Sequence, residues 1–222
     1  FRFYYGARVY STTISPDGEW LAVGGLAGNI LVVDLEAGKT VADLPSDREY
    51  IDFLVFTRDG GTLLAGYERP GNLVGAWDTG TWREAWTVAH APGRFDYHDA
   101  LLTPDGKALI LGTHGIREGR DAIEFLDLQS RQVVRRLGGY EGAPYQLAVS
   151  PDGALLAAGL NEGAVWIWEL ATGEPVKVIP PAGGSVMSLA FSPDGTLLAF
   201  AVEGTEIQIW GVAGEALTPP CP

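Results

Sequence analysis

The chain is a succession of short apolar runs separated by turns rich in Gly, Pro and Asp. Two such runs, 187–191 and 197–200, flank the turn Ser192-Pro193-Asp194-Gly195. In this turn Pro restricts the φ angle of the second position. The hydroxyl side chain at the first position can hydrogen-bond to the backbone of the turn, and Gly is favoured at the fourth position. A tight turn between two short apolar runs predicts a β-hairpin.

Turns of this type occur five times along the chain, with Arg58 in place of Pro in the second copy. The spacing between the first residues of successive copies is 42, 46, 47 and 42 residues. Repeats at this period are typical of a protein whose units must stack to bury their apolar faces. The five copies begin at Ser15, Thr57, Thr103, Ser150 and Ser192.

Each repeat contains apolar runs for four strands, and no segment shows sustained helical periodicity with good caps. Four short strands per unit at this period predict an all-β fold, a β-propeller of five four-stranded blades in a single domain over residues 1–222. The predicted strands of the first unit are 9–15, 20–24, 30–35 and 39–44. The five units are 7–48, 49–93, 94–140, 141–183 and 184–218.

The two ends of the chain are predicted to differ from the regular units. Residues 1–6 alternate like a strand but have no hairpin partner, and the fifth unit has three good strands followed by a proline-rich tail. An unpaired apolar sheet edge is an aggregation hazard, which proteins avoid by pairing it. Residues 1–6 are therefore expected to close the ring as the outermost strand of the fifth unit. The alternative is that they complete a blade outside this chain, which would then be part of a larger propeller.

Several predicted third strands end in Trp-Asp or a related pair: Trp77-Asp78, Trp168-Glu169, Trp210-Gly211, Val33-Asp34 and Leu126-Asp127. With the repeated turns, these endings resemble the WD-repeat family over residues 9–212, and the degenerate form resembles repeats of bacterial proteins. Family members typically carry a Gly-His pair before the inner strand, whose His joins a buried hydrogen-bonded network. None of the three His follows Gly here, so that network is expected to be absent or replaced, with apolar stacking stabilising the blades.

Alignment on the turns reveals columns of equivalent residues. The residue before each turn is always apolar, which predicts packing between blades. The residue nine positions after the turn's first residue is small, which suggests close approach of neighbouring backbones. The first column is Ile14, Phe56, Leu102, Val149 and Phe191, and the second is Gly24, Gly66, Gly112, Gly159 and Ala201.

A third column, five residues before the turn, mixes chemical types. Its members, with the neighbouring Asp99, are predicted to line the mouth of the central channel, where a propeller binds its partners. The plainer interpretation is a polar channel wall filled with water. These binding candidates are Tyr10, Asp52, His98, Asp99, Tyr145 and Met187.

Aromatic residues mark a second candidate surface. Trp82 and Trp86 alternate with polar residues in the predicted outer strand 82–88. Aromatic side chains are enriched at protein interfaces, although packing between blades would explain them as well.

Charge and composition argue against several functions. The formal net charge of −13 disfavours nucleic acid and anionic membranes as partners, and no apolar run is long enough for a membrane-spanning helix. The basic cluster Arg131, Arg135 and Arg136 is interpreted as the solvated side of an edge strand. The single Cys221 excludes an intrachain disulfide framework and leaves the compartment open.

No catalytic, metal or cofactor site is predicted. His98 and Asp99 could suggest a general base or a metal site, but adjacent strand residues point to opposite faces. The predicted function is a non-catalytic platform that binds another protein or the subunits of a larger assembly. The alternative is a ligand-binding or enzymatic propeller with a site at the channel mouth, built from Asp52, His98, Asp99 and Tyr145.

Overall fold

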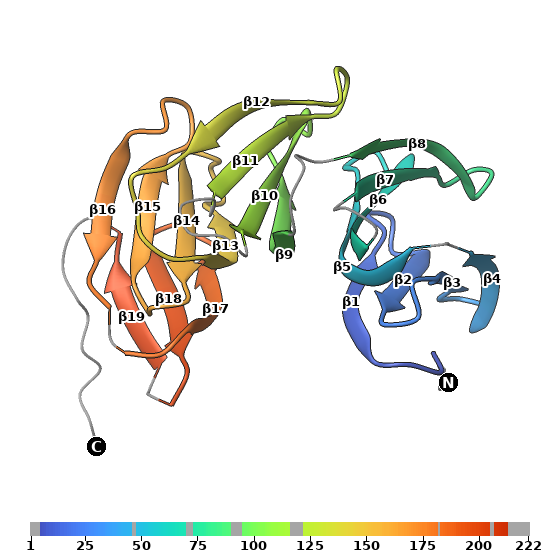
Figure 1. Cartoon of the computed structure of the whole chain (residues 1–222), viewed down its shortest axis with the longest axis horizontal. Helices are drawn as coiled ribbons and strands as arrows, with labels where there is room; N and C mark the ends of the chain where they lie inside the picture. Colours follow the sequence, from blue (N-terminus) through green and yellow to red (C-terminus); the bar gives the residue numbers. More distant parts are fainter. Residues whose placement is uncertain are drawn as a thin grey trace. The chain divides into compact units, whose positions relative to one another are not determined.

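The computed structural model describes residues 5–45, 48–69, 73–89, 95–115, 122–181, 183–204 and 207–212, and these ranges contain nineteen β-strands and no helix (Figure 1). The all-β prediction is confirmed. The strands are β1 (Val9–Ile14), β2 (Trp20–Gly25), β3 (Ile30–Asp34), β4 (Lys39–Leu44), β5 (Glu49–Phe56), β6 (Thr62–Arg69), β7 (Leu73–Asp78), β8 (Arg83–Ala89), β9 (Phe95–Leu102), β10 (Ala108–Gly115), β11 (Ala122–Asp127), β12 (Gln132–Leu137), β13 (Pro144–Val149), β14 (Leu155–Leu160), β15 (Val165–Glu169), β16 (Pro175–Ile179), β17 (Val186–Phe191), β18 (Leu197–Val202) and β19 (Ile207–Gly211).

The strands form five antiparallel sheets, one for each predicted unit. Strands follow one another in chain order across each sheet: β1–β4 form the first, β5–β8 the second, β9–β12 the third, β13–β16 the fourth and β17–β19 the fifth. The fifth sheet has three strands within the described part of the chain. Residues 1–4 of the predicted closing strand lie outside the described residues, so ring closure is not confirmed.

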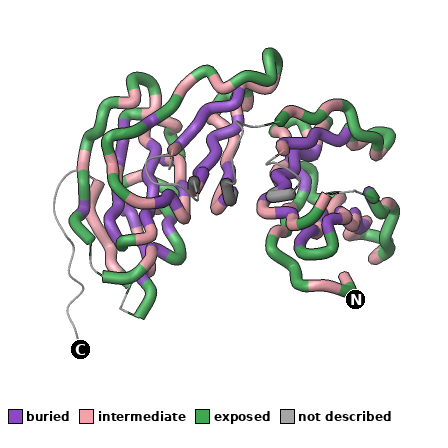
Figure 2. The backbone as a smooth tube through the Cα atoms, viewed as in Figure 1, coloured by how far each residue is buried: buried purple, intermediate pink, exposed green. Residues whose placement is uncertain are grey.

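The chain divides into two compact units. The first contains the described residues up to Leu102, and the second those from Thr103 onward, with Gly115 assigned to the first. The division therefore falls between β9 and β10. Within the sheets the fourth strands β4, β8, β12 and β16 are mostly exposed, whereas β7, β11 and β14 are almost wholly buried (Figure 2).

The repeated turns join the first and second strands as predicted, and side chains reinforce them. In the fifth sheet the amide of Gly195 donates to the carbonyl of Ser192 at 2.9 Å. The Ser192 hydroxyl donates to the Asp194 carboxylate at 2.5 Å and accepts a hydrogen bond from the Leu197 amide at 2.9 Å. This hydroxyl bridge lowers the pKa of Asp194 to about 2, with a smaller contribution from the Thr196 amide. The turn is therefore bonded to the first residue of the next strand.

Within each unit, inner strands pack on the preceding sheet: β5 lies against β1 and β2, and β17 lies against β13 and β14. Small residues permit this stacking. A Cβ added to Gly24 would lie 2.8 Å from Cγ2 of Ile51, and one added to Gly159 would overlap Val186. The predicted close approach of neighbouring backbones is wrong at these two positions, because the neighbour is a side chain of the next sheet. At Gly66, in the same column, the neighbour is the Phe53 side chain of the same sheet.

The predicted packing column is only partly confirmed. Phe56 is buried in the core between the first and second sheets, together with Ile51 and Leu54. Ile14, at the equivalent position of the first sheet, has an exposed fraction of 58%. The packing prediction for Ile14 stays a prediction, because the described part of the first unit contains no sheet that precedes its own.

Candidate functional site

The chemically mixed column coincides with a β-bulge. In the inner strands β1, β5, β13 and β17 the register with the second strand shifts at this residue: Tyr10, Asp52, Tyr145 and Met187. A bulge inserts an extra residue and re-aims its side chain. The side chain is therefore released from the inward and outward alternation of the strand, which explains why the column is not uniformly apolar.

The bulge residues lie on neighbouring strands. Tyr10, Asp52 and His98 belong to β1, β5 and β9, which pack side by side in the first unit. Tyr145 and Met187 belong to β13 and β17, which are neighbours in the second unit. Tyr10 and Met187 are exposed, with fractions of 45% and 55%.

Asp52, His98, Asp99 and Tyr145 are all partly buried. The carboxylate of Asp99 accepts a hydrogen bond from the amide of Ala100 at 2.8 Å. It is thus held by the backbone next to it. The prediction that these side chains line a channel mouth stays a prediction.

Trp82 is part of a turn and not of the outer strand. Strand β8 begins at Arg83, so the predicted strand 82–88 was wrong at its start. Trp82 has a φ of 53°, in the left-handed region that the equivalent Gly38 and Gly173 occupy in other sheets. Its ring lies edge-on to Trp20 of the first sheet, with centroids 5.8 Å apart. This contact holds Trp82 against the core between the first and second sheets.

Trp86 lies within β8 and is partly buried. Its position corresponds to Arg135 in β12 and to Lys177 in β16, counted from the end of the third strand. Arg135 donates to the carbonyl of Leu170 at 2.6 Å, and Lys177 donates to the carbonyl of Gly211 at 3.4 Å. Both side chains thus reach the next sheet, so this column of the outer strands links sheets.

Two members of the basic cluster, Arg135 and Arg136, contact other residues within the fold. Arg135 also lies over the ring of Phe125, 5.0 Å from its centroid, and Arg136 forms an ion pair with the buried Glu124 at 2.5 Å. The interpretation of this cluster as a merely solvated face is therefore wrong for Arg135 and incomplete for Arg136. Charges that are paired or bound to carbonyls within the fold are poor phosphate ligands, which agrees with the acidic composition.

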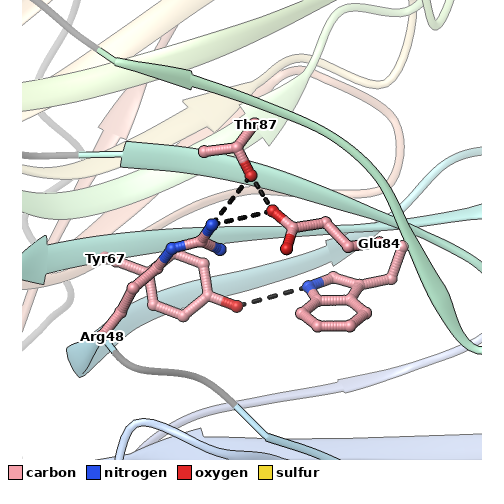
Figure 3. Close-up of polar contacts among 5 residues, drawn as sticks. Arg48, Tyr67, Glu84 and Thr87 are labelled. Carbon is pink, nitrogen blue, oxygen red and sulfur yellow. Dashed lines mark hydrogen bonds and ion pairs between the residues drawn. The ribbon is translucent and has the colours of Figure 1, made fainter.

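A polar cluster joins Arg48 to side chains of the second sheet (Figure 3). Arg48, just before β5, donates to the carboxylate of Glu84 at 2.8 Å and to the hydroxyl of Thr87 at 3.1 Å. Its guanidinium lies over the ring of Tyr67, 4.9 Å from the centroid. The indole of Trp77 donates to the Tyr67 hydroxyl at 3.3 Å.

The electrostatics of this cluster favour a charged arginine and a neutral tyrosine. Burial by itself would lower the pKa of Arg48, but the hydrogen bond and charge of Glu84 outweigh it and raise the pKa above its ordinary value. Burial raises the pKa of Tyr67, against the opposing effects of Trp77 and Arg48. Apolar stacking is therefore not the only interaction that stabilises this sheet. The expectation that the family's histidine network is absent or replaced stays a prediction.

Sequence reasoning missed Arg48, although a signal existed. It directly precedes the inner strand, where family members carry their histidine, and the Trp77-Asp78 pair follows in the same repeat. Arg48 and Glu84 are 36 residues apart, so only the pairing of β5, β6, β7 and β8 brings them together.

Among the residues that the structure describes, no three or more His, Cys, Asp or Glu side chains lie close enough together to hold a metal ion. No helix in this part of the chain could span a membrane. The expected absence of metals and cofactors stays a prediction.

Comparison with known families identifies the repeats. Three segments match the family described as WD domain, G-beta repeat: residues 2–34, 131–169 and 173–210. The last two matches begin near the start of a fourth strand and extend through the first three strands of the next sheet. The chain is therefore a WD-repeat-like protein with β-propeller-type sheets, as the turns and strand endings predicted.

A curated relative supplies a more particular likeness. The chain is 25% identical over 182 residues to the THO complex subunit 6 homolog of Danio rerio, and the alignment covers 77% of this chain. It covers 56% of the relative, so the chain spans about half the length of that protein. The likeness to an animal protein does not support the bacterial type that the degenerate repeats suggested.

Proposed function

We propose that the chain is a non-catalytic interaction platform, a WD-like propeller domain over residues 1–222 that binds other proteins within an assembly. The observation that carries the proposal is the repeated bulge on the inner strands. It presents side chains of mixed chemical type at the same place on the inner strands of four separate sheets. Side chains fixed on rigid elements form a specific binding surface at little entropic cost.

The comparisons support the same function. WD repeats occur in proteins that bind other proteins, and the relative from Danio rerio is named as a subunit of a complex. Fold alone would not establish function, so the proposal depends on the site as well. The partner is another protein or several subunits of one complex. Nucleic acid and membrane lipid are not proposed as partners, because the net charge is −13.

The proposed contact residues form two sets. In the first unit they are Tyr10, Asp52, His98 and Asp99, and in the second unit Tyr145 and Met187. Exposed Tyr and Met are suited to interfaces, since they provide large adaptable contact area. Trp86 is a further candidate, whereas Trp82 is already engaged with Trp20.

The experiment isolates the tagged protein from its source cells and identifies proteins that co-purify stoichiometrically. Tyr10→Ala and Met187→Ala should each lower partner recovery at least tenfold. Their free energies of unfolding should stay within about 1 kcal/mol of the wild type, as for exposed positions.

Val176→Ala is the matched control, because Val176 is as exposed as Met187, with fractions of 57% and 55%, but lies on the outer strand β16. It should leave partner recovery unchanged. Equal recovery with all three variants would contradict the proposed surface. Absence of any stoichiometric partner would contradict the proposed function.

A further inference from the structure

One position of the outer strands differs in chemistry between the fourth sheet and the first three. The position is defined by its pairing with the third strand: Asp43 lies opposite Leu31, Thr87 opposite Gly75 and Arg136 opposite Glu124. In these three sheets the outer-strand residue is polar and has a polar partner: Asn29 donates to Asp43 at 2.7 Å, Arg48 donates to Thr87 at 3.1 Å, and Arg136 pairs with Glu124. Polar residues are expected on the solvent-facing part of an antiparallel sheet.

The fourth sheet has an apolar pair at the same position. Val178 of β16, the outermost strand of this sheet (Figure 1), lies opposite Trp166 of β15. Val178 has an exposed fraction of 45%, and Trp166 is partly exposed. Trp166 stacks on the buried Trp168 with ring centroids 5.8 Å apart, and the centroid of the Tyr140 ring lies 6.2 Å from that of Trp166. These contacts hold the aromatic rings in place, while the outer part of the apolar pair stays in contact with solvent.

The other face of these two strands packs against the fifth sheet. Ile167 of β15 is buried in the core shared with β17 and β18, and Lys177 of β16 donates to the carbonyl of Gly211. Because neighbouring residues of a strand point to opposite faces, Trp166 and Val178 point away from the fifth sheet. Tyr140, Trp166 and Val178, here called the Trp166 patch, all belong to the second unit.

Acidic side chains border the Trp166 patch. Glu141 follows Tyr140 directly and is exposed. Glu162 is exposed as well, and a Cβ added to Gly142 would overlap its carboxylate, so this group lies beside the segment that carries Tyr140. A partner with a positive charge is therefore favoured, whereas a second copy of this chain, with a net charge of −13, is not.

We propose that the Trp166 patch is a docking site for a protein segment that carries an aliphatic or aromatic side chain next to a lysine or an arginine. The apolar side chain of the partner lies on Val178 and the exposed part of Trp166, and the basic side chain faces Glu141 and Glu162. An exposed apolar patch with a polar border marks an interaction site, and Trp and Tyr are enriched among the residues that contribute most to binding. The patch includes the outer strand β16, so the proposal does not depend on the bulge surface of the inner strands.

The test selects peptides that bind the purified chain from a phage-displayed library of random sequences, and measures their affinity by fluorescence anisotropy. The selected peptides should combine an aliphatic or aromatic residue with Lys or Arg. Val178→Lys should weaken their binding by about tenfold or more, because it removes the apolar contact and repels the basic side chain. The fold should tolerate this change, because the third sheet has a cation, Arg136, at the same position.

Val176→Lys is the matched control, because it makes the same charge change at another exposed valine of β16, with an exposed fraction of 57%. It should leave the affinity within about twofold of the wild type, and so should Tyr10→Ala, which alters the bulge surface. Val178→Thr, which has the residue of the second sheet at this position, replaces Val178→Lys if thermal unfolding shows that the latter does not fold. Failure to select any peptide, selected peptides without a basic residue, or binding that depends on Tyr10 and not on Val178 would overturn the proposal.

Discussion

One hydroxyl group in each repeated turn affects both the ionisation of an aspartate and the start of a strand. Asp17, Asp59, Asp105, Asp152 and Asp194 all have a lowered pKa, and the hydrogen bond from the preceding Ser or Thr is the largest cause in each case. The same hydroxyl accepts a hydrogen bond from the amide five residues on. The turn aspartates therefore have a structural role.

Ser192→Ala should raise the pKa of Asp194 from about 2 toward its ordinary 3.8, because the largest stabilising hydrogen bond is lost. A lowered carboxyl pKa stabilises the fold above the ordinary value, and this contribution disappears as the pH falls through the folded value. The part of the stability difference between the wild type and Ser192→Ala that comes from the pKa shift should therefore be fully present above pH 3.8 and absent near pH 2. Carboxyl NMR titration measures the shift. Ser188→Ala, in the same sheet but outside the turn, is the control, and an unchanged pKa in Ser192→Ala would disprove the assignment.

Arg48→Met should lower the free energy of unfolding by about 1–3 kcal/mol, the usual contribution of hydrogen bonds to a charged group. The methionine keeps the contact with the Tyr67 ring but removes the hydrogen bonds from Arg48 to Glu84 and Thr87, while the Thr87 hydroxyl still donates to Glu84. The free energy of unfolding of Arg48→Lys should lie between those of the wild type and Arg48→Met, because lysine keeps the positive charge but lacks the planar guanidinium group. Urea unfolding measures the change. The exposed Arg58→Met should shift stability by less than about 0.5 kcal/mol, and an Arg48→Met variant as stable as this control would contradict the role of the cluster.

At the scale of the element, the strands and their hairpins were predictable because their signals are local. The turn residues, the apolar alternation and the aspartates that end the third strands all act within a few residues. Asp78 shows this, since its carboxylate accepts from the amide of Thr81 at 2.8 Å and begins the turn to β8. The start of β8 was misjudged because Trp82 alternates with its neighbours in sequence yet adopts a left-handed φ.

Gly24→Ala should destabilise the protein by about 1–3 kcal/mol, as expected for overpacking of a core. The added methyl group would lie 2.8 Å from Cγ2 of Ile51, so the first and second sheets would have to separate or Ile51 would have to shift. Gly24→Ala should destabilise the Ile51→Ala variant less than the wild type, because the shorter side chain leaves room for the added methyl group. A double-mutant cycle should therefore give a coupling energy of about 0.5–3 kcal/mol. Gly138→Ala, with nothing within 4 Å of the added atom, should be nearly neutral. Additive effects of Gly24→Ala and Ile51→Ala would show that the two residues do not meet.

At the scale of the whole molecule, the open question for stability is what completes the sheet of β17–β19. The family match over residues 2–34 ends at Asp34, the last residue of β3, as the match over 131–169 ends at the last residue of β15. The latter match begins at the start of a fourth strand, β12. By the same register, residues before β1 correspond to a fourth strand, which supports the prediction that residues 1–6 extend a three-stranded sheet.

Deletion of residues 1–6 should therefore lower stability by several kcal/mol, because it exposes the ladder edge and apolar surface of β19. The amides of β18 and β19 should show the largest gain in hydrogen exchange. The amides of β6 and β7, buried in another sheet, serve as the internal control. Unchanged protection of β19 after the deletion would show that residues 1–6 do not pair with it.

The sequence by itself determined the five repeats, the order of the strands and the chemistry of the turns, because each depends on residues close together in the chain. Tertiary structure decided which equivalent positions are buried. Ile51 has an exposed fraction of 0%, since β5 packs on β1 and β2 of the preceding sheet in the same unit. Tertiary structure also assembled Arg48, Tyr67 and Glu84, whose side chains meet only after several strands have paired. The bulge depends on both sequence and tertiary structure. The sequence shows a column of mixed residue types, but the reason for the mixture is the extra residue that the strand pairing places at Tyr10, Asp52, Tyr145 and Met187.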